Sequence, residues 1–581
     1  MKNPKLIFIL AIALLIGILY LLPLWLRDGF GFDQLRYFSL TFAYAWSLAF
    51  FILAGIFFFL PLPRFLEKLN SGYLLAVTGL IWMAGLYFLR TSAPLLGDGL
   101  DRIISLGSAL WPLLKSEPAP LDLTIHWICY QAMKNHVNAN FLGYTLASYA
   151  AGIFYLVMVL VLVRRVFSRG TERILAALIL LSPGYIQLFA GYAENYSFLP
   201  GLMLFWVIGT LETEKGRIRV LIISQVLLTL CNFLFLLILP ATLYLLLTSP
   251  EKRIRFWAGI LSLLGAVLGA ISVGIAWKTS LGWSMFLTPE RIFVLGHLID
   301  FLNQQILASP AFPLLLAGLF CTEKGIKNSR PEKALLTGGV ILVIFFFLVR
   351  TGIGATRDWD LLTLPAMLYT PFLVLYLFRR LENKQNLLVK FAIMVFLVSA
   401  FHTGAWLLLN HSEEKMIARI QFHLDENRER ERWASAYGWT VLGRHYVLTG
   451  KINEAMNAFD KSIQIHPSYS QNRLIYGYHL WKLGRYQEAI SELEMAHQIN
   501  PTNPGIKKFL GHFYLEYARI LLNANQINEA AKYLKKNFDL MPDWRLGLEA
   551  LVDFYKNYLK DPEKARYYEQ ILKQTKNQEK P

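Results

Sequence analysis

Long apolar runs recur along the first 410 residues of this chain of 581. A helix needs about 20 mostly apolar residues to cross the ~30 Å hydrocarbon core of a bilayer. The runs predict thirteen spans, near 5–26, 38–61, 73–89, 141–163, 173–190, 196–211, 219–230, 233–247, 256–277, 309–321, 334–349, 361–378 and 387–409. The first run is too long for a signal peptide and has no small-residue cleavage site, so we expect it to remain as a helix. From residue 411 the chain becomes polar but keeps a helical pattern.

Positive charge is distributed as expected for a membrane protein and argues against nucleic-acid binding. The whole chain has a net charge of +17, while residues 411–581 hold 25 Lys and Arg against 21 Asp and Glu and so contribute only +4. The remaining +13 lies mostly in short loops, as the positive-inside rule predicts. We therefore expect a cytoplasmic N-terminus and, after thirteen spans, a C-terminal domain outside. A bacterial inner membrane is favoured, with the endoplasmic reticulum lumen as the outer side if the source is eukaryotic.

The C-terminal region contains an internal repeat of 34 residues. Four positions of one unit recur in the next, where Gly443, Gly450, Ala455 and Pro467 are followed by Gly477, Gly484, Ala489 and Pro501. This pattern matches the tetratricopeptide repeat (TPR), in which small residues let two antiparallel helices approach and a proline ends each unit. Stacked repeats present a concave surface for a peptide or protein. The predicted fold is all-α, with a transmembrane bundle at 1–410, a charged helical linker at 411–432 and a TPR-type α-solenoid at 433–581.

Three polar segments with carboxylates fall at predicted outer ends of the membrane helices. They are residues 96–102, 191–196 and 356–360, which contain Asp98, Glu194 and Arg357 among their charged residues. Because distant parts of the sequence supply them, the predicted topology places three acidic clusters on one face of the membrane. Charged groups near the midplane would instead favour a transporter.

A predicted outer loop, residues 90–140, has a specific order of features. It begins with Asp98, continues into an amphipathic helix suited to the membrane interface, and contains Pro118 and Pro120. Over residues 70–410 this order resembles the GT-C superfamily of membrane glycosyltransferases. The fusion to C-terminal repeats is similar in layout to the TPR-containing O-mannosyltransferases.

The resemblance implies an activity and roles for individual residues. The chain would transfer a sugar from a polyprenyl-phosphate lipid donor to an acceptor hydroxyl, of a protein or another molecule, on the outer or periplasmic face, with inversion. Asp98 and Glu194 would be the catalytic carboxylates. The residues expected to bind the donor phosphate and sugar are Arg102, Arg357, Asp358 and Asp360. The TPR domain would recruit the acceptor. The resemblance fixes no cofactor and leaves a divalent metal, Mg²⁺ or Mn²⁺, open; its ligands would come from Asp98, Glu194, Asp358 or Asp360.

Each of these expectations has a structural alternative. Asp98 precedes a predicted helix and could be only an N-cap, while residues 357–360 could form an interfacial salt-bridge network. The histidines without ligand spacing, expected to be structural, are His126, His136, His402 and His411. Three widely spaced cysteines offer neither a disulfide framework nor a CxxC motif. The alternative functions are a polytopic transporter or flippase, an O-antigen polymerase or ligase with a lipid-pyrophosphate donor, and a non-catalytic membrane TPR scaffold.

Overall fold

The computed structural model describes residues 4–22, 29–60, 71–107, 110–116, 118–249, 252–278, 286–322, 327–426 and 432–578. Within these ranges the chain forms α-helices joined by short 3-10 turns, and the one extended pairing there is an isolated bridge between Phe286 and Val349. The all-α prediction is confirmed. The chain divides into two compact units, Met1–His423 and Leu424–Pro581.

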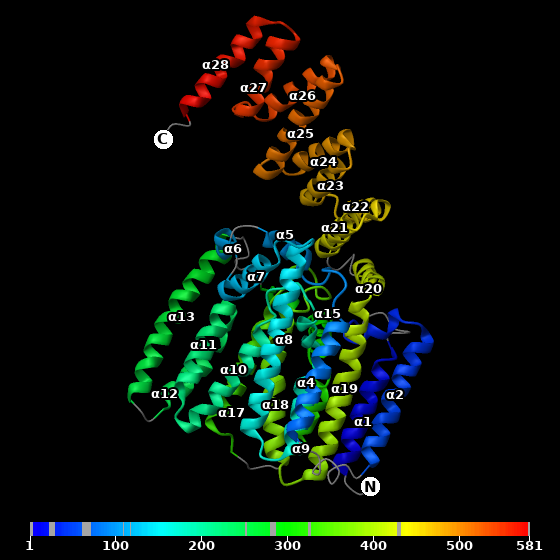
Figure 1. Cartoon of the computed structure of the whole chain (residues 1–581), viewed down its shortest axis with the longest axis vertical. Helices are drawn as coiled ribbons and strands as arrows, with labels where there is room; N and C mark the ends of the chain where they lie inside the picture. Colours follow the sequence, from blue (N-terminus) through cyan, green and yellow to red (C-terminus); the bar gives the residue numbers. More distant parts are fainter. Residues whose placement is uncertain are drawn as a thin grey trace. The chain divides into compact units, whose positions relative to one another are not determined.

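Six helices of the first unit are long and apolar enough to cross a membrane. They are α2 (Leu40–Phe59), α4 (Ser71–Phe88), α8 (Ala139–Val166), α17 (Arg330–Leu348), α18 (Leu364–Leu381) and α19 (Gln385–His411). Figure 1 shows α10 (Leu199–Glu212), α11 (Ile218–Cys231) and α13 (Lys252–Lys278) beside them. The other helices of the bundle are shorter, namely α1 (Pro4–Leu19), α9 (Gly170–Leu180), α12 (Leu239–Leu247) and α16 (Phe312–Leu319). The first unit is thus a multi-pass membrane domain. Six spans meet the criteria of length and composition among the described residues; the full set of thirteen is not shown.

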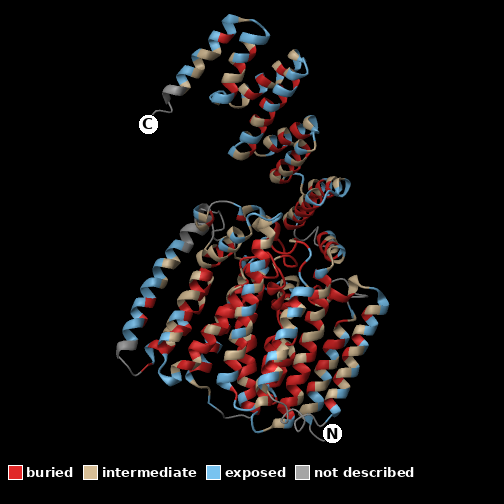
Figure 2. Cartoon of the chain, viewed as in Figure 1, coloured by how far each residue is buried: buried red, intermediate tan, exposed pale blue. Residues whose placement is uncertain are grey.

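The outer surface of this bundle is apolar, as lipid contact requires. Figure 2 shows exposed residues along α2 and α13 and buried ones toward the middle of the bundle. The exposed side chains include Leu48, Leu80 and Leu263, which are 58%, 72% and 69% exposed. Contiguous apolar surface of this kind is rare on soluble monomers, whereas in a bilayer it is solvated by lipid.

The long loop after α4 folds into short helices, as the sequence predicts. They are α5 (Gly99–Leu106), α6 (Leu110–Ser116) and α7 (Pro120–Met133). The amphipathic α5 buries Leu100 and Leu106 and leaves Ile104 exposed. Pro120 stands in the first turn of α7, where its missing N–H has no intrahelical partner to lose. One helix of this unit, α15 (Leu295–Ala308), lies between the predicted spans and was not predicted.

The second unit consists of helix pairs at the predicted repeats. The pairs are α21 (Arg432–Leu448) with α22 (Ile452–Ile465), α23 (Ser470–Lys482) with α24 (Tyr486–Ile499), α25 (Pro504–Asn523) with α26 (Ile527–Leu540), and α27 (Arg545–Asp553) with α28 (Pro562–Gln578). Gly450 and Gly484 take left-handed φ values of 76° and 78° in the turns within the first two pairs. A Cβ on Gly443 would lie 2.7 Å from the Phe459 ring, so this position needs a glycine for close helix packing. Helical repeats are therefore confirmed. In the predicted linker, α20 (Glu413–Glu426) begins after a break at Ser412, and residues 427–431 lie outside the described ranges.

Candidate active site

The loop that follows α4 is tied to two other parts of the first unit. The Thr91 backbone N–H donates to the Ala190 carbonyl at 2.8 Å, and the Thr91 hydroxyl donates to the same oxygen at 3.0 Å. The Ser92 N–H and hydroxyl both donate to the Asn410 carbonyl at 3.1 Å. These bonds place the start of the loop beside the 190–196 segment and the end of α19.

Gly97 lies where the three polar segments meet. Its N–H donates to the Arg357 carbonyl at 3.0 Å, and the Arg357 Nη2 donates back to the Gly97 carbonyl at 3.1 Å. A Cβ on Gly97 would lie 2.5 Å from Glu194 Oε1 and 2.8 Å from Asp360 Oδ2. Gly97 also has a φ of +58°, which non-glycine residues rarely adopt. A glycine is thus needed here on both counts, and its surroundings bring the 96–102, 191–196 and 356–360 segments together.

Asp98, Arg102 and Glu194 lie together around the start of α5. The Asp98 N–H donates to Glu194 Oε1 at 2.5 Å. Arg102 Nε lies 3.5 Å from Glu194 Oε2, and Arg102 Nη2 lies 3.8 Å from Asp98 Oδ2. Glu194 is 2% exposed, whereas the Asp98 side chain is 39% exposed. The Asp98 side chain makes no N-cap hydrogen bond. Its carboxylate therefore borders the solvent, and the simple N-cap alternative does not describe it.

The side chains of Asp360 and Asp358 have different hydrogen-bond partners near Gly97. Asp360 is 1% exposed, and its Oδ2 accepts from the Tyr192 hydroxyl at 3.2 Å. Trp359 Nε1 donates to the same hydroxyl oxygen at 3.0 Å. Asp358 Oδ2 instead accepts from the Gly352 N–H at 2.9 Å, so this carboxylate closes its own loop. Asp360 is the member of the pair that joins the buried carboxylate cluster.

The acidic loop rests on two amides of the unpredicted helix α15. Gln304 Nε2 donates to the Ala355 carbonyl, and Gln305 Nε2 donates to the Leu362 carbonyl at 3.1 Å. Both glutamines are buried. The adjacent amides Asn303, Gln304 and Gln305 of α15 were the available sequence signal, because buried amides need hydrogen-bond partners. Tyr192 was inside a predicted segment, but its contact with Asp360 could not be anticipated.

Burial and crowding keep protons on the inner carboxyl groups. Burial, with the neighbouring Asp360, raises the pKa of Glu194 well above its usual range. Burial and Asp358 raise the pKa of Asp360 to about 8, while burial and Asp98 raise that of Asp358 to about 7. Burial alone would lower the pKa of Arg102, but Glu194 and Asp98 outweigh it and raise that pKa. The site therefore combines a cation with inner carboxyl groups that favour the protonated form, and an outer carboxylate, Asp98.

This pattern predicts how the stability of the membrane unit changes with pH. The folded protein holds a proton on Asp360 up to about pH 8, whereas in the unfolded chain the Asp360 carboxyl has its ordinary pKa of 3.8. Stability contributed by the neutral form is thus complete at low pH and lost as pH rises through this window. We expect Asp360→Asn, which stays neutral, to flatten the fall in melting temperature between about pH 4 and 8. The matched variant Asp101→Asn should keep the wild-type slope; an unchanged slope for Asp360→Asn would contradict the assignment.

The metal left open by the sequence finds no ligand set in the described part of the chain. No group of three or more His, Cys, Asp and Glu side chains there has the arrangement of a metal site. In particular, Asp358 is directed to Gly352 and Glu194 to the Asp98 N–H and Arg102.

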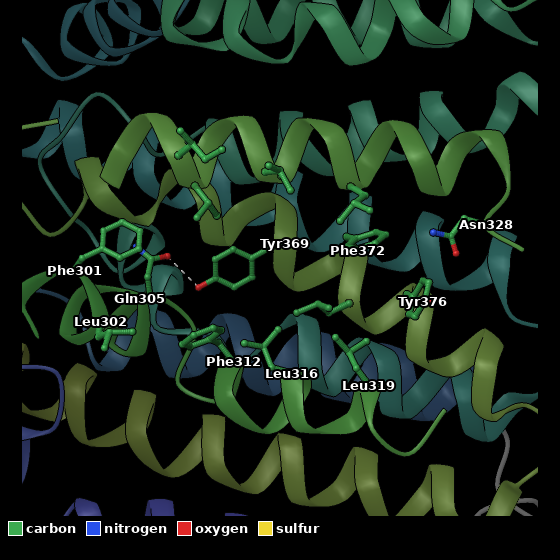
Figure 3. A pocket seen from close by; sticks show the side chains of 16 residues that line it. Phe301, Leu302, Gln305, Phe312, Leu316, Leu319, Asn328, Tyr369, Phe372 and Tyr376 are labelled. Atoms are coloured by element: carbon green, nitrogen blue, oxygen red, sulfur yellow. Dashed lines mark hydrogen bonds between the residues drawn. The ribbon is translucent and has the colours of Figure 1, made fainter. Parts of the chain in front are cut away.

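An elongated apolar cavity begins beneath the acidic loop. It has a volume of about 520 Å³ and lies between α15, α16, α17 and α18. Figure 3 shows Gln305 and Phe301 toward one end and Asn328 at the other. The Tyr369 hydroxyl donates to Gln305 Oε1 at 3.1 Å. Since Gln305 also binds the Leu362 carbonyl, this end of the cavity adjoins the segment that carries Asp360.

Comparisons with known proteins find only distant similarity. No protein family model and no curated protein match the sequence. Among solved structures the chain is similar to ArnT from Cupriavidus metallidurans in the apo state, at 14% identity, over 74% of this chain and 76% of that chain, with a TM-score of 0.35. It is also similar to a mutant of MamA, at 16% identity, over 28% of this chain and 99% of that one, with a TM-score of 0.19. It is similar as well to the APC/C hetero-tetramer Cut9-Hcn1, at 14% identity, over 78% of this chain and 82% of that one, with a TM-score of 0.18. These similarities assign no activity to this chain.

Proposed function

We propose that the chain is a membrane glycosyltransferase of the GT-C type, which moves a sugar from a polyprenyl-phosphate donor to an acceptor hydroxyl. The observation that carries the proposal is the meeting of Asp98, Arg102, Glu194, Arg357 and Asp360 around Gly97, at one end of an apolar cavity. A lipid-linked sugar needs a polar site for its sugar and phosphate next to an apolar site for its lipid chain. We assign this end to the outer side of the membrane, as the loop charges predict.

In this mechanism Asp98 is the general base. The Asp98 side chain is more exposed than those of Arg102 and Glu194, so an acceptor hydroxyl can approach its carboxylate from the solvent. Removal of the hydroxyl proton lets the acceptor oxygen attack the anomeric carbon, and the lipid phosphate leaves from the opposite face with inversion. Glu194 positions the Asp98 backbone and Arg102, and its protonated form avoids a second full charge near the base.

The departing phosphate requires a cation or hydrogen-bond donors. Arg357 and Arg102 are the candidates; Arg357 is 3% exposed and bound to the Gly97 carbonyl, whereas the Arg102 side chain is 19% exposed. We assign Arg357 to the donor phosphate and Arg102 to the Asp98–Glu194 pair. Asp360 then accepts from Tyr192 and orients sugar hydroxyls together with Asp358.

The apolar cavity is assigned to the lipid chain of the donor. Its walls are aliphatic and aromatic side chains, with Gln305, Tyr369 and Asn328 as polar members. An isoprenoid would enter this cavity from the bilayer, which is equally apolar, so the cavity would hold the chain by shape and van der Waals contact. Its phosphate would then lie at the Gln305 end, beside the acidic loop.

The C-terminal solenoid is assigned to recruitment of the acceptor. Its helix pairs form repeats of a kind that bind peptides or proteins, and the unit is compact on its own. We expect deletion of residues 433–581 to spare transfer to a small soluble acceptor and to reduce modification of the natural acceptor, because tethering raises local acceptor concentration to the millimolar range. Parallel assays of the truncated and full chains with both acceptors measure this. Equal activity of the truncated chain on both acceptors would contradict recruitment.

The direct test of the function is transfer by the purified chain in liposomes. A labelled sugar on polyprenyl phosphate is the donor, and appearance of the label on an acceptor, or in water as free sugar, is the measurement. Movement of labelled lipid between leaflets without bond cleavage would instead indicate a flippase. Use of a lipid-pyrophosphate donor alone would indicate a polymerase or ligase.

A further inference from the structure

A second buried acid–base pair lies outside the carboxylate cluster. Asp122 and His126 are four residues apart on α7, and both are fully buried. His126 Nδ1 lies 3.1 Å from Asp122 Oδ2 and 2.8 Å from the Asp122 carbonyl. From α11, Cys231 Sγ donates to Asp122 Oδ1 at 3.8 Å. The Asp122 main-chain carbonyl therefore fixes one nitrogen of the imidazole ring, and Asp122 Oδ2 lies close to that nitrogen without a hydrogen-bond partner among the described residues. His126 Nε2 has no hydrogen-bond partner among the described residues.

The imidazole ring packs against a tyrosine that leads back to the site. The centroids of the His126 and Tyr144 rings are 4.6 Å apart. Tyr144, on α8, is 1% exposed and packs with Leu106 of α5 and with Ala193. Its hydroxyl donates to Asn195 Oδ1 at 3.2 Å. These contacts join three helices to the segment that carries Glu194.

The last contact in the series reaches the carboxyl group itself. The Asn195 N–H donates to Glu194 Oε2 at 3.4 Å, the same oxygen that lies 3.5 Å from Arg102 Nε. A long hydrogen bond of this kind holds Glu194 only if Asn195 is itself held in place. In the described structure the side chain of Asn195 is held by the Tyr144 hydroxyl.

We propose that His126, held by Asp122, is a positioning residue for Glu194 and acts through Tyr144 and Asn195. This inference rests on the proposed function for its kinetic consequence, but not for its structural one. A buried histidine beside a buried carboxylate costs more free energy than apolar side chains of the same size, because both groups lose their hydration and neither Asp122 Oδ2 nor His126 Nε2 has a hydrogen-bond partner among the described residues. A role confined to packing α7 against α8 is the competing explanation. It requires no connection between the dyad and Glu194.

Two variants test the series of contacts. Tyr144→Phe keeps the ring that stacks on His126 and removes only the hydroxyl that donates to Asn195. His126→Asn keeps an N–H near the Nδ1 position toward Asp122 and removes the ring. The matched control is Tyr130→Phe, which loses the same atom from α7 in the same cluster, where no hydrogen bond of that hydroxyl is described.

The first readout is independent of activity. We expect Tyr144→Phe and His126→Asn to speed amide hydrogen exchange in residues 192–196 at least about tenfold, and Tyr130→Phe to leave it unchanged. Unchanged exchange in both test variants, or equal acceleration in the control, would overturn the proposal. This result stands whether or not the chain transfers sugar.

The second readout is a double-mutant cycle on transfer. We expect Tyr144→Phe to lower kcat about tenfold with little change in the donor KM, and to have little further effect in a Glu194→Gln background, since both act on one group. Losses that multiply independently would overturn the positioning role. If the wild-type chain transfers no sugar although the exchange result is as expected, the proposed function fails and the positioning of Glu194 remains.

Discussion

Asp98→Asn is expected to lower sugar transfer by about 10²–10⁴-fold, the range for loss of a general base. The amide cannot take the proton of the acceptor hydroxyl, while its size leaves the start of α5 unchanged. The Asp98 side chain makes no cap hydrogen bond, and its contact with Arg102 is a long one of 3.8 Å. Arg102 keeps its other partner, Glu194. The rate of transfer from a labelled donor, with the melting temperature of the same sample, measures the effect.

Asp101→Asn is the control, since it makes the same chemical change in the first turn of the same helix. We expect it to stay near the wild-type rate. If Asp98→Asn transfers sugar at a nearly normal rate in a folded protein, another group is the base, and Glu194 or Asp360 would have to be tested in its place.

The meeting of three segments could be predicted from the sequence because hydropathy and loop charge assign helix ends to one side of a membrane. That reasoning placed 96–102, 191–196 and 356–360 together, and the structure brings them into contact at Gly97. It could not give the pairing within the cluster. Whether Asp358 or Asp360 joins Glu194 depends on the turn of a short loop, and Asp358 in fact closes that loop through Gly352.

Two features of the site were missed for physical reasons. Helix α15 has 14 residues and two buried glutamines, so neither its length nor its apolarity marks it as a span. His126 has no partner at metal-ligand spacing, but Asp122 lies one helical turn before it. That i, i+4 pair was visible in the sequence. Its significance depends on burial and on the Tyr144 contact, which arise only when α7 packs against α8.

Arg357 is assigned to the donor phosphate, yet its side chain is almost fully buried. Its substitution is therefore an informative test of the site. The side chain is 3% exposed and donates to the Gly97 carbonyl at 3.1 Å. A guanidinium bound there can hold the glycine turn and also present its remaining N–H groups to a phosphate, because its five donors lie in one planar fork. Lysine keeps the charge but cannot serve both partners at once.

We therefore expect Arg357→Ala to reduce transfer by about 10²–10³-fold, as for loss of a donor that stabilises developing negative charge. Arg357→Lys should restore little of this loss, and poorer use of the donor should exceed any change in acceptor KM. Arg350→Lys, at an exposed position just before the same loop, is the control. Donor kinetics and the melting temperature are measured for each variant. Donor kinetics report on phosphate binding, and the melting temperature reports on the hydrogen bond to the Gly97 carbonyl. If both Arg357 variants lower the melting temperature but leave donor kinetics unchanged, Arg357 only holds Gly97. Arg102, the more exposed of the two cations, would then be the group that meets the phosphate.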